Sequence, residues 1–390
     1  MYWAFFKWRQ SKSLPQDLGK KFVPAAGISK YLTKYFFSYH LIRIKVILVM
    51  NQKELAEILG VSQATVSLAL AGDARVNAAT KRKICAVARK LGYVPNASAR
   101  ALVRKRTETI GVVVLGLSKD NMRSELFFSD AILTIGLELG NLGYNILLKV
   151  EELIGKEEFL TDLAREKRVD GLIILTLAPF YREFLGGLEE MDFPFVLVNR
   201  HLGEYPVNCV VLDDYGATYQ AVEYLYGLGH RQLVYLAGDD QCSALADRAY
   251  GFRAAVRDYA LAESVNRVIS FTDGNRENLV TYLNQYGPPT GVIAYNDVRA
   301  LEAKQILAEF KLSPPVDYSL IGFDNRFTIF SEEISLTTFD YSLAEMGQKA
   351  VRLLLDVMKG KTVEREKIMV TPCFLERRSC GPPPLKVTSN

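Results

Sequence analysis

From residue 109 onward, the 390-residue chain alternates short apolar runs with helical stretches. The apolar runs are rich in Val, Ile and Leu and are predicted as strands at 110–115, 144–150, 171–176, 195–198, 233–237, 268–271, 291–295 and 319–323. Continuous apolar strands joined by helices are typical of parallel sheets that are covered on both faces. A stretch of about 270 residues is long enough for two such sheets. We therefore expect an α/β body with two doubly wound parallel-sheet subdomains.

Polar residues follow several of these strands. They are Asn199, Arg248, Asn296, Asp297 and Asp324. Ligands of open α/β sheets bind beyond the carboxyl ends of the strands, so these side chains are candidates for a small-molecule site. Arg248 is the first candidate, because a guanidinium fork binds carboxylates and hydroxyls well. The alternative is that Asn or Asp after a strand forms a turn or caps a helix.

A separate helical segment precedes the body. Asn51 and Glu54 have the spacing of a capping box, and Gly60 ends this first helix. Further helices are predicted over 63–70 and 78–91. The residues expected to face inward are Leu55, Ile58, Leu59, Val66, Leu70, Ile84, Val87, Ala88 and Leu91. Two helices joined by a tight glycine turn and braced by a third form the helix-turn-helix plan, although a helical bundle with no ligand has the same spacing.

Charge is distributed unevenly along the chain. Residues 50–107 carry 11 Lys and Arg against three acidic residues, whereas residues 108–390 carry 28 basic and 40 acidic ones. A basic N-terminal segment followed by an acidic body indicates that the N-terminal segment binds a polyanion. The chain as a whole is 49% hydrophobic and 24% charged, which excludes a mostly disordered chain and a polytopic membrane protein.

The first 49 residues carry nine Lys and Arg against Asp17 alone. Their apolar stretch, 31–49, is interrupted by Lys34, His40, Arg43 and Lys45, so we expect neither a membrane anchor nor a signal peptide. Our hypothesis is that Met50 is the true initiator and that 1–49 is a non-native or disordered extension. The alternative is a basic arm that assists DNA binding.

Three motifs carry a resemblance to a known family. They are GVSQATVSLAL at 60–70, VNAATKRKICAVARKLGYVPNASARALV at 76–103 and TIGVVV at 109–114. Together they resemble the lactose/galactose repressor family of bacterial transcription regulators. The resemblance implies a helix-turn-helix domain over 50–94, a hinge helix and linker over 95–108, an effector-binding and dimerisation body over 109–381, and a tail over 382–390.

The resemblance also implies which residues contact DNA. The second helix would lie in the major groove, where Gln63, Ala64 and Leu68 would face base edges. Ser62, Thr65 and Ser67 would contact phosphates or pack. Leu68 departs from the polar residue that is common at its position in the family, so the resemblance does not imply an operator sequence for this chain. In the hinge, Asn96, Arg100 and Leu102 would enter the minor groove, with Leu102 wedged between bases.

The body is similar to periplasmic sugar-binding proteins through VLVNR, YNDVRAL, LIGFDN, LTTFD and MGQKAVRLLL. The resemblance implies subdomains of about 109–210 plus 340–369 and 211–339 plus 370–381, with crossings near Val211, Asp340 and Val370. It assigns Arg248, Asn296, Asp297, Asp324 and Asn199 to the effector. The loop 118–128 is longer than the family's form and the helix after it carries Thr134 in place of the usual glycine, so effector identity does not carry over. Phe127 and Phe128 would stack on a sugar or base, or pack in the core.

These features predict a sequence-specific repressor, a homodimer on a near-palindromic operator, whose DNA affinity is set by a sugar or sugar derivative bound between the subdomains. We expect it in the cytoplasm, on DNA and not at a membrane. The alternatives are a solute-binding protein without a DNA role and a sugar or nucleoside enzyme. The chain has five cysteines with no CxxC pair and three scattered histidines, and it has no nucleophile or nucleotide motif. We therefore expect no metal site, no cofactor and no catalytic residue.

Overall fold

The computed structural model describes residues 51–93, 106–116, 126–151, 158–176, 182–272, 275–325, 335–361 and 364–384. The chain divides into two compact units, Met1–Arg100 and Ala101–Asn390. The predicted extension 1–49 and most of the predicted hinge lie outside the described residues. None of the helices described is both long and apolar enough to cross a membrane.

The described part of the first unit, 51–93, contains three short helices: α3 (Gln52–Leu59), α4 (Gln63–Ala71) and α5 (Ala78–Lys90). The predicted capping box is present, because the Asn51 side chain accepts from the Glu54 backbone N–H and the Glu54 carboxylate accepts from that of Asn51. Gly60 ends α3 with a φ of 66°, a left-handed conformation that glycine adopts at low cost. This turn lets α4 follow α3 after only three residues.

The core of this unit is formed by Leu55, Ala56, Val66, Ala69, Ile84 and Ala88. Two residues predicted to face inward do not do so. Ile58 is 58% exposed, because Leu55 and Ala56 occupy the buried side of the two-turn helix α3. Leu91 is 40% exposed, because it is the C-cap of α5, where the chain leaves the helical path.

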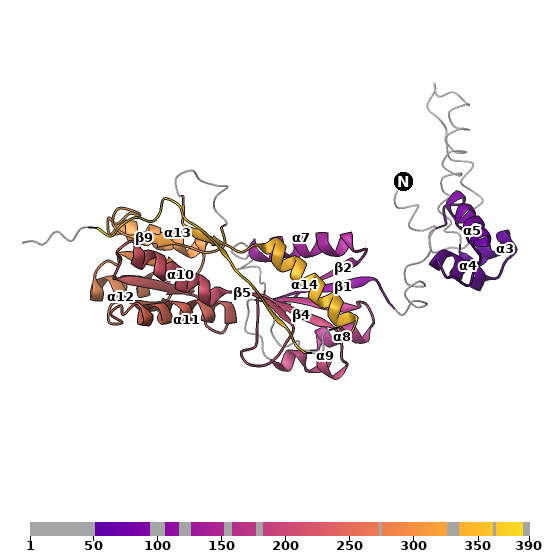
Figure 1. Ribbon diagram of the computed structural model, residues 1–390, viewed down its shortest axis with the longest axis horizontal. Coiled ribbons are helices and arrows are strands. Elements are labelled where there is room, and N and C mark those ends of the chain that lie inside the picture. The colour runs from indigo at the N-terminus through magenta and orange to yellow at the C-terminus, as the bar shows by residue number, and fades with distance from the viewer. Residues whose placement is uncertain are drawn as a thin grey trace, which may run out of the picture. The chain divides into compact units, whose positions relative to one another are not determined.

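The second unit begins with a six-stranded parallel sheet in the order β11-β5-β4-β3-β1-β2. Its strands are β1 (Thr109–Leu115), β2 (Asn145–Glu151), β3 (Gly171–Thr176), β4 (Phe195–Val198), β5 (Cys209–Leu212) and β11 (Lys367–Val370). Helices α7 (Leu126–Asn141) and α14 (Leu343–Met358) cover one face (Figure 1). Helices α8 (Phe159–Arg165) and α9 (Gly186–Glu190), with the 3₁₀ turn η1 (Arg182–Leu185), cover the other. We call this layer the first subdomain.

The second subdomain has a four-stranded parallel sheet in the order β7-β6-β8-β9. Its strands are β6 (Leu233–Ala237), β7 (Arg267–Ser270), β8 (Gly291–Ala294) and β9 (Ser319–Ile321). Helices α10 (Asp214–Gly227) and α11 (Ser243–Asp258) pack on one face, and α12 (Arg276–Tyr286) and α13 (Asp297–Glu309) on the other. Gly251 lets α10 and α11 approach closely, since a Cβ there would lie 2.2 Å from the Tyr215 carbonyl oxygen.

The chain passes between the subdomains three times. It runs from β5 into α10, from β10 (Thr338–Asp340) into α14, and from β11 into β12 (Cys373–Leu375). Strands β10 and β12 pair antiparallel as a two-stranded ribbon. The sequence did not predict β5, β10, β11 or β12, but the predicted fold class is confirmed: a helix-turn-helix unit followed by an α/β body with two parallel sheets.

Candidate functional site

The beginning of α4 is exposed to solvent. Ser62 caps the helix, and its Oγ accepts the Thr65 backbone N–H at 3.0 Å and pairs with the Thr65 hydroxyl at 2.8 Å. Gln63 and Ala64 are exposed, while Val66 and Ala69 are buried one turn later. The helix therefore holds its core with one face and presents its first turn to solvent.

The other predicted contacts are less exposed or lie elsewhere. Thr65, Ser67 and Leu68 are half-buried. The hinge residues Asn96, Arg100 and Leu102 lie outside the described residues. The first unit's described part, 51–93, carries seven Lys and Arg against three acids. Arg75 bonds to Asp73 at 2.8 Å and holds the pKa of that carboxyl down at about 2, so this pair is neutral. The remaining surplus of positive charge suits a phosphate backbone.

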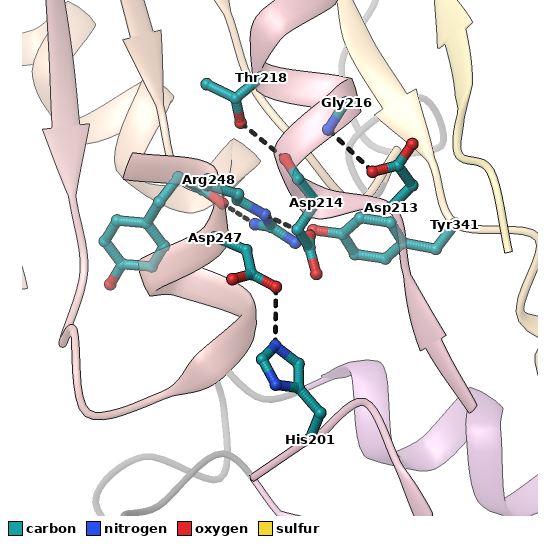
Figure 2. Close-up of polar contacts among 9 residues, drawn as sticks. His201, Asp213, Asp214, Gly216, Thr218, Asp247, Arg248 and Tyr341 are labelled. Atoms are coloured by element: carbon teal, nitrogen blue, oxygen red, sulfur yellow. Dashed lines mark hydrogen bonds and ion pairs between the residues drawn. The ribbon is translucent and has the colours of Figure 1, made fainter. Parts of the chain in front are cut away.

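In the body, Arg248 on α11 joins three separate segments (Figure 2). Its Nε donates to Asp214 Oδ1 at 2.7 Å, at the start of α10 after the first crossing. Its other two nitrogens donate to the Tyr295 carbonyl oxygen, after β8, and to the Tyr341 hydroxyl, after β10. The guanidinium also lies 4.5 Å from the centre of the Phe323 ring. We call Arg248, Asp214, Tyr295 and Tyr341 the Arg248 cluster.

Arg248 and Asp214 are only 4% and 2% exposed. Burial raises the pKa of Asp214 to about 6, although the attraction of Arg248 opposes this shift. Burial alone would lower the pKa of Arg248, but Asp214, Tyr341 and Tyr235 raise it well above its ordinary value. Both groups are therefore charged at neutral pH, and the 2.7 Å contact is an ion pair.

A second polar contact links the two subdomains beside this cluster. His201, which follows β4 in the first subdomain, bonds through Nε2 to Asp247 Oδ2 at 2.8 Å on α11 of the second (Figure 2). The Gly203 backbone N–H donates to His201 Nδ1 at 3.1 Å, so Nδ1 is an acceptor and Nε2 carries the proton. The His201 backbone N–H also donates to Ser243 Oγ.

The predicted effector residues take different places. Asn199 is buried at the end of β4, in the left-handed conformation with a φ of 59°, and its Oδ1 has no hydrogen-bond partner among the described residues. Asp324 follows β9, and its charge acts on both Arg248 and Tyr341. Asp324 therefore belongs to the surroundings of Arg248, whereas no hydrogen bond among the described residues joins Asn199 to the Arg248 cluster.

The remaining predicted residues are engaged in structure or are not described. Asn296 caps α13 by accepting the Arg299 backbone N–H at 2.9 Å, which is the alternative that its position after a strand allowed. Asp297 is buried and accepts the Thr338 hydroxyl at 2.6 Å. The side chains of Phe127 and Phe128 lie outside the described residues.

Sequence reasoning missed Asp214, Tyr341, His201 and Asp247. Asp213 does cap α10, but Asp214 beside it is the partner of Arg248. Asp214 and Tyr341 follow β5 and β10, two strands that the sequence does not predict, so the strand-end rule does not identify them. Within the described ranges, no group of three or more His, Cys, Asp or Glu is placed to hold a metal ion.

Comparison with known proteins agrees with both units. Residues 51–96 match the family described as bacterial regulatory proteins, lacI family, and residues 222–380 match a periplasmic binding protein-like domain. The transcriptional repressor CytR of Escherichia coli is 31% identical over 322 residues, covering 80% of this chain and 91% of CytR. The transcriptional regulator DegA of Bacillus subtilis is 29% identical over 339 residues, covering 84% and 97%.

Solved structures agree with the fold. A lac repressor dimer bound to operator has a TM-score of 0.73 at 24% identity, covering 85% of this chain and 99% of that one. A complex of the transcriptional regulator CelR with cellobiose has a TM-score of 0.63 at 26% identity and the same coverage. These relatives are transcriptional regulators, which confirms the predicted class of function over an enzyme.

Proposed function

The chain belongs to the LacI family of bacterial regulatory proteins, which are DNA-binding transcriptional regulators, and we propose that it is a repressor controlled by a small molecule in its body. The observation that carries this proposal is the exposed first turn of α4 on a basic three-helix unit. The proposed place of action is the cytoplasm, where operator DNA is accessible.

The proposed DNA contacts begin with Gln63, whose amide can make paired hydrogen bonds to adenine in the major groove. Ala64 and Leu68 would contact apolar base edges such as the thymine methyl group. Ser62, Thr65 and Ser67 would contact phosphates. Asn96, Arg100 and Leu102 would act in the minor groove, and for them the sequence motif is the whole support.

The test is operator binding by the full chain. A near-palindromic duplex is first selected from a random library, and its affinity is then measured by fluorescence anisotropy. We expect Gln63→Ala to weaken binding by about ten- to a hundredfold and to relax the preference at one base pair in each half-site. Gln220→Ala, an exposed glutamine of α10, is the matched control. Wild-type affinity and preference in Gln63→Ala would contradict the proposed recognition helix.

The proposed effector is a sugar or a sugar derivative. CelR is solved with cellobiose, and a LacI-family regulator of Enterococcus faecium, 27% identical with a TM-score of 0.59, with ribose. We propose that Arg248, Asp324 and Asn199 face the effector, with Phe127 and Phe128 contributing from the loop before α7. Asn296 and Asp297 would act indirectly, by fixing the end of β8 and the start of α13.

The proposed assembly is a homodimer, because a two-fold protein matches a near-palindromic operator. An exposed apolar surface of the first subdomain supports it. The surface consists of Leu133 and Leu137 on α7 and Ile146, Leu148 and Val150 on the edge strand β2. A surface of this kind on a soluble protein marks an interaction site.

A further inference from the structure

The position of Asp214 limits the charge that a ligand of the Arg248 site can carry. A guanidinium aimed at a ligand would attract a phosphate or a carboxylate. Here the guanidinium of Arg248 already holds a carboxylate of the same chain at 2.7 Å, and both side chains are buried. An anionic ligand would therefore meet a neutral pair in place of a free positive charge.

Further carboxylates surround this pair. Asp324 acts electrostatically on Arg248, and Asp213 and Asp247 act on Asp214. Two more cations lie in this region: the buried Arg200 acts on Cys242 together with Asp214, and Arg253 of α11 acts on Tyr235 together with Arg248 and Asp214. Four carboxylates against three guanidiniums leave a surplus of one negative charge, which in a poorly solvated site opposes a second anion.

Two buried polar groups of the body can pair with the hydroxyl of a ligand. Asn199 Oδ1 is buried without a partner among the described residues, as is the hydroxyl of Tyr235, which lies close enough to Arg248 and Asp214 to feel their charges. Carboxylates and amide oxygens accept hydrogen bonds, and sugar hydroxyls supply the matching donors. An ionised phosphate or carboxylate only accepts, so it could accept from the Tyr235 hydroxyl but would leave Asn199 Oδ1 without a donor.

We propose that Asp214 makes the Arg248 site selective for an uncharged, hydroxyl-rich ligand, such as a free sugar or a nucleoside, over the phosphorylated or carboxylated counterpart. This inference rests on the proposed function only in taking the site to be the effector site. Asp214 acts as a specificity-determining residue through Arg248, without itself needing to touch the ligand.

The first experiment uses inorganic phosphate as the probe, because a small anion needs no stereochemical match. Thermal unfolding of the full chain is followed with and without phosphate at constant ionic strength. We expect no Arg248-dependent stabilisation of the wild type. In Asp214→Asn, which keeps the shape and one acceptor but frees the charge of Arg248, we expect at least about tenfold tighter phosphate binding and a rise in Tm of about 2–4 °C.

The matched control is Asp247→Asn, which removes a neighbouring carboxylate on α11 but leaves the Asp214–Arg248 pair intact. We expect it to gain much less phosphate binding than Asp214→Asn, because Arg248 keeps its carboxylate partner. An equal gain in both variants, or none in Asp214→Asn, would overturn the proposal. If Asp214→Asn does not fold, Asp214→Ser carries the same test, since it opens the place of the carboxylate to phosphate.

The second experiment offers the wild type matched pairs: glucose and glucuronate, glucose and glucose 6-phosphate, and cytidine and its monophosphate. We expect Arg248→Met to abolish binding only of the uncharged ligand of a pair. Arg248-dependent binding of an anionic member would overturn the proposal. Operator binding is measured separately, so a chain that fails to bind DNA would count against the proposed function and leave the phosphate result valid.

Discussion

His230 is a buried titratable residue whose surroundings accept only its neutral form. It is fully buried before β6, and Nε2 donates to the Gly381 carbonyl oxygen at 2.8 Å and lies 2.9 Å from Ser319 Oγ. Its Nδ1 is buried and has no hydrogen-bond partner among the described residues. Protonation would place an N–H there without an acceptor, and burial accordingly lowers the pKa of His230 below its ordinary value.

This shift predicts a loss of stability on acidification. The unfolded chain takes up the proton near the ordinary pKa of about 6.5, whereas the folded chain resists it until a lower pH. The contribution of His230 to the free energy of unfolding is therefore complete above about pH 6.5 and decreases as the pH falls through the folded pKa, by at most about 1.4 kcal/mol per pH unit. Urea unfolding between pH 8 and pH 5 measures it.

His230→Gln keeps a donor for Gly381 but does not titrate. We expect its free energy of unfolding to depend less steeply on pH over this range than that of the wild type, whatever its value at pH 8. Equal slopes in the two proteins would show that His230 is not the group responsible.

The effector candidates of the body could be predicted from the sequence only where the strand before them was predicted too. The strand-end rule predicts Arg248, Asp324 and Asn199, and the first two belong to one buried cluster or its surroundings. Asn296 also follows a strand, but it caps α13. A helix cap and a ligand-binding residue can both come directly after a strand, so the sequence does not distinguish them. Asp214, the partner that neutralises Arg248, could not be found without recognising β5.

At the scale of elements, the long helices and fully buried strands were the predictable part. The six buried residues of β3 and the amphipathic helix α14 carry strong patterns. Length does not explain the missed strands β5, β10, β11 and β12, since they contain three or four residues each, as do β4, β7, β8 and β9, which were predicted. The missed strands form or flank the crossings between subdomains, where the partner strand comes from a distant part of the chain.

The contact between α10 and α11 predicts the effect of one glycine substitution. In Gly251→Ala, the new Cβ would lie 2.2 Å from the Tyr215 carbonyl oxygen, so the two helix backbones must separate. We expect the free energy of unfolding to fall by about 1–3 kcal/mol, as is usual for overpacking. Operator affinity is expected to decrease less, because the helix-turn-helix is a separate unit.

Gly227→Ala at the end of α10 is the matched control. A Cβ at Gly227 would meet no atom within 4 Å, and alanine favours helix more than glycine does. Its stability should stay the same or rise slightly in the same urea titration. A Gly251→Ala protein as stable as Gly227→Ala would mean that the helices are not in close contact.

At the scale of the whole molecule, the exposed apolar surface of α7 and β2 is the proposed dimer interface, and through pairing it would affect DNA binding. Leu133 and Leu137 lie one helical turn apart, and a Cβ on Gly136 between them would lie 3.1 Å from Ile146 of β2. The surface is thus continuous from the helix to the edge of the six-stranded sheet. A second copy of the chain that covered it would also bring a second recognition helix to the operator.

Leu137→Arg tests this link. The side chain is 71% exposed in the single chain, so the substitution should leave the fold intact but place a charge in the proposed interface. We expect sedimentation to show a monomer, and operator affinity to fall by about a hundredfold, since a linked pair of half-site contacts exceeds a single one by two to four orders of magnitude. Val316→Arg, at a 70% exposed position of the second subdomain, should change neither property. A Leu137→Arg protein that remains a dimer would move the interface elsewhere, and a monomer with full operator affinity would break the connection between pairing and DNA recognition.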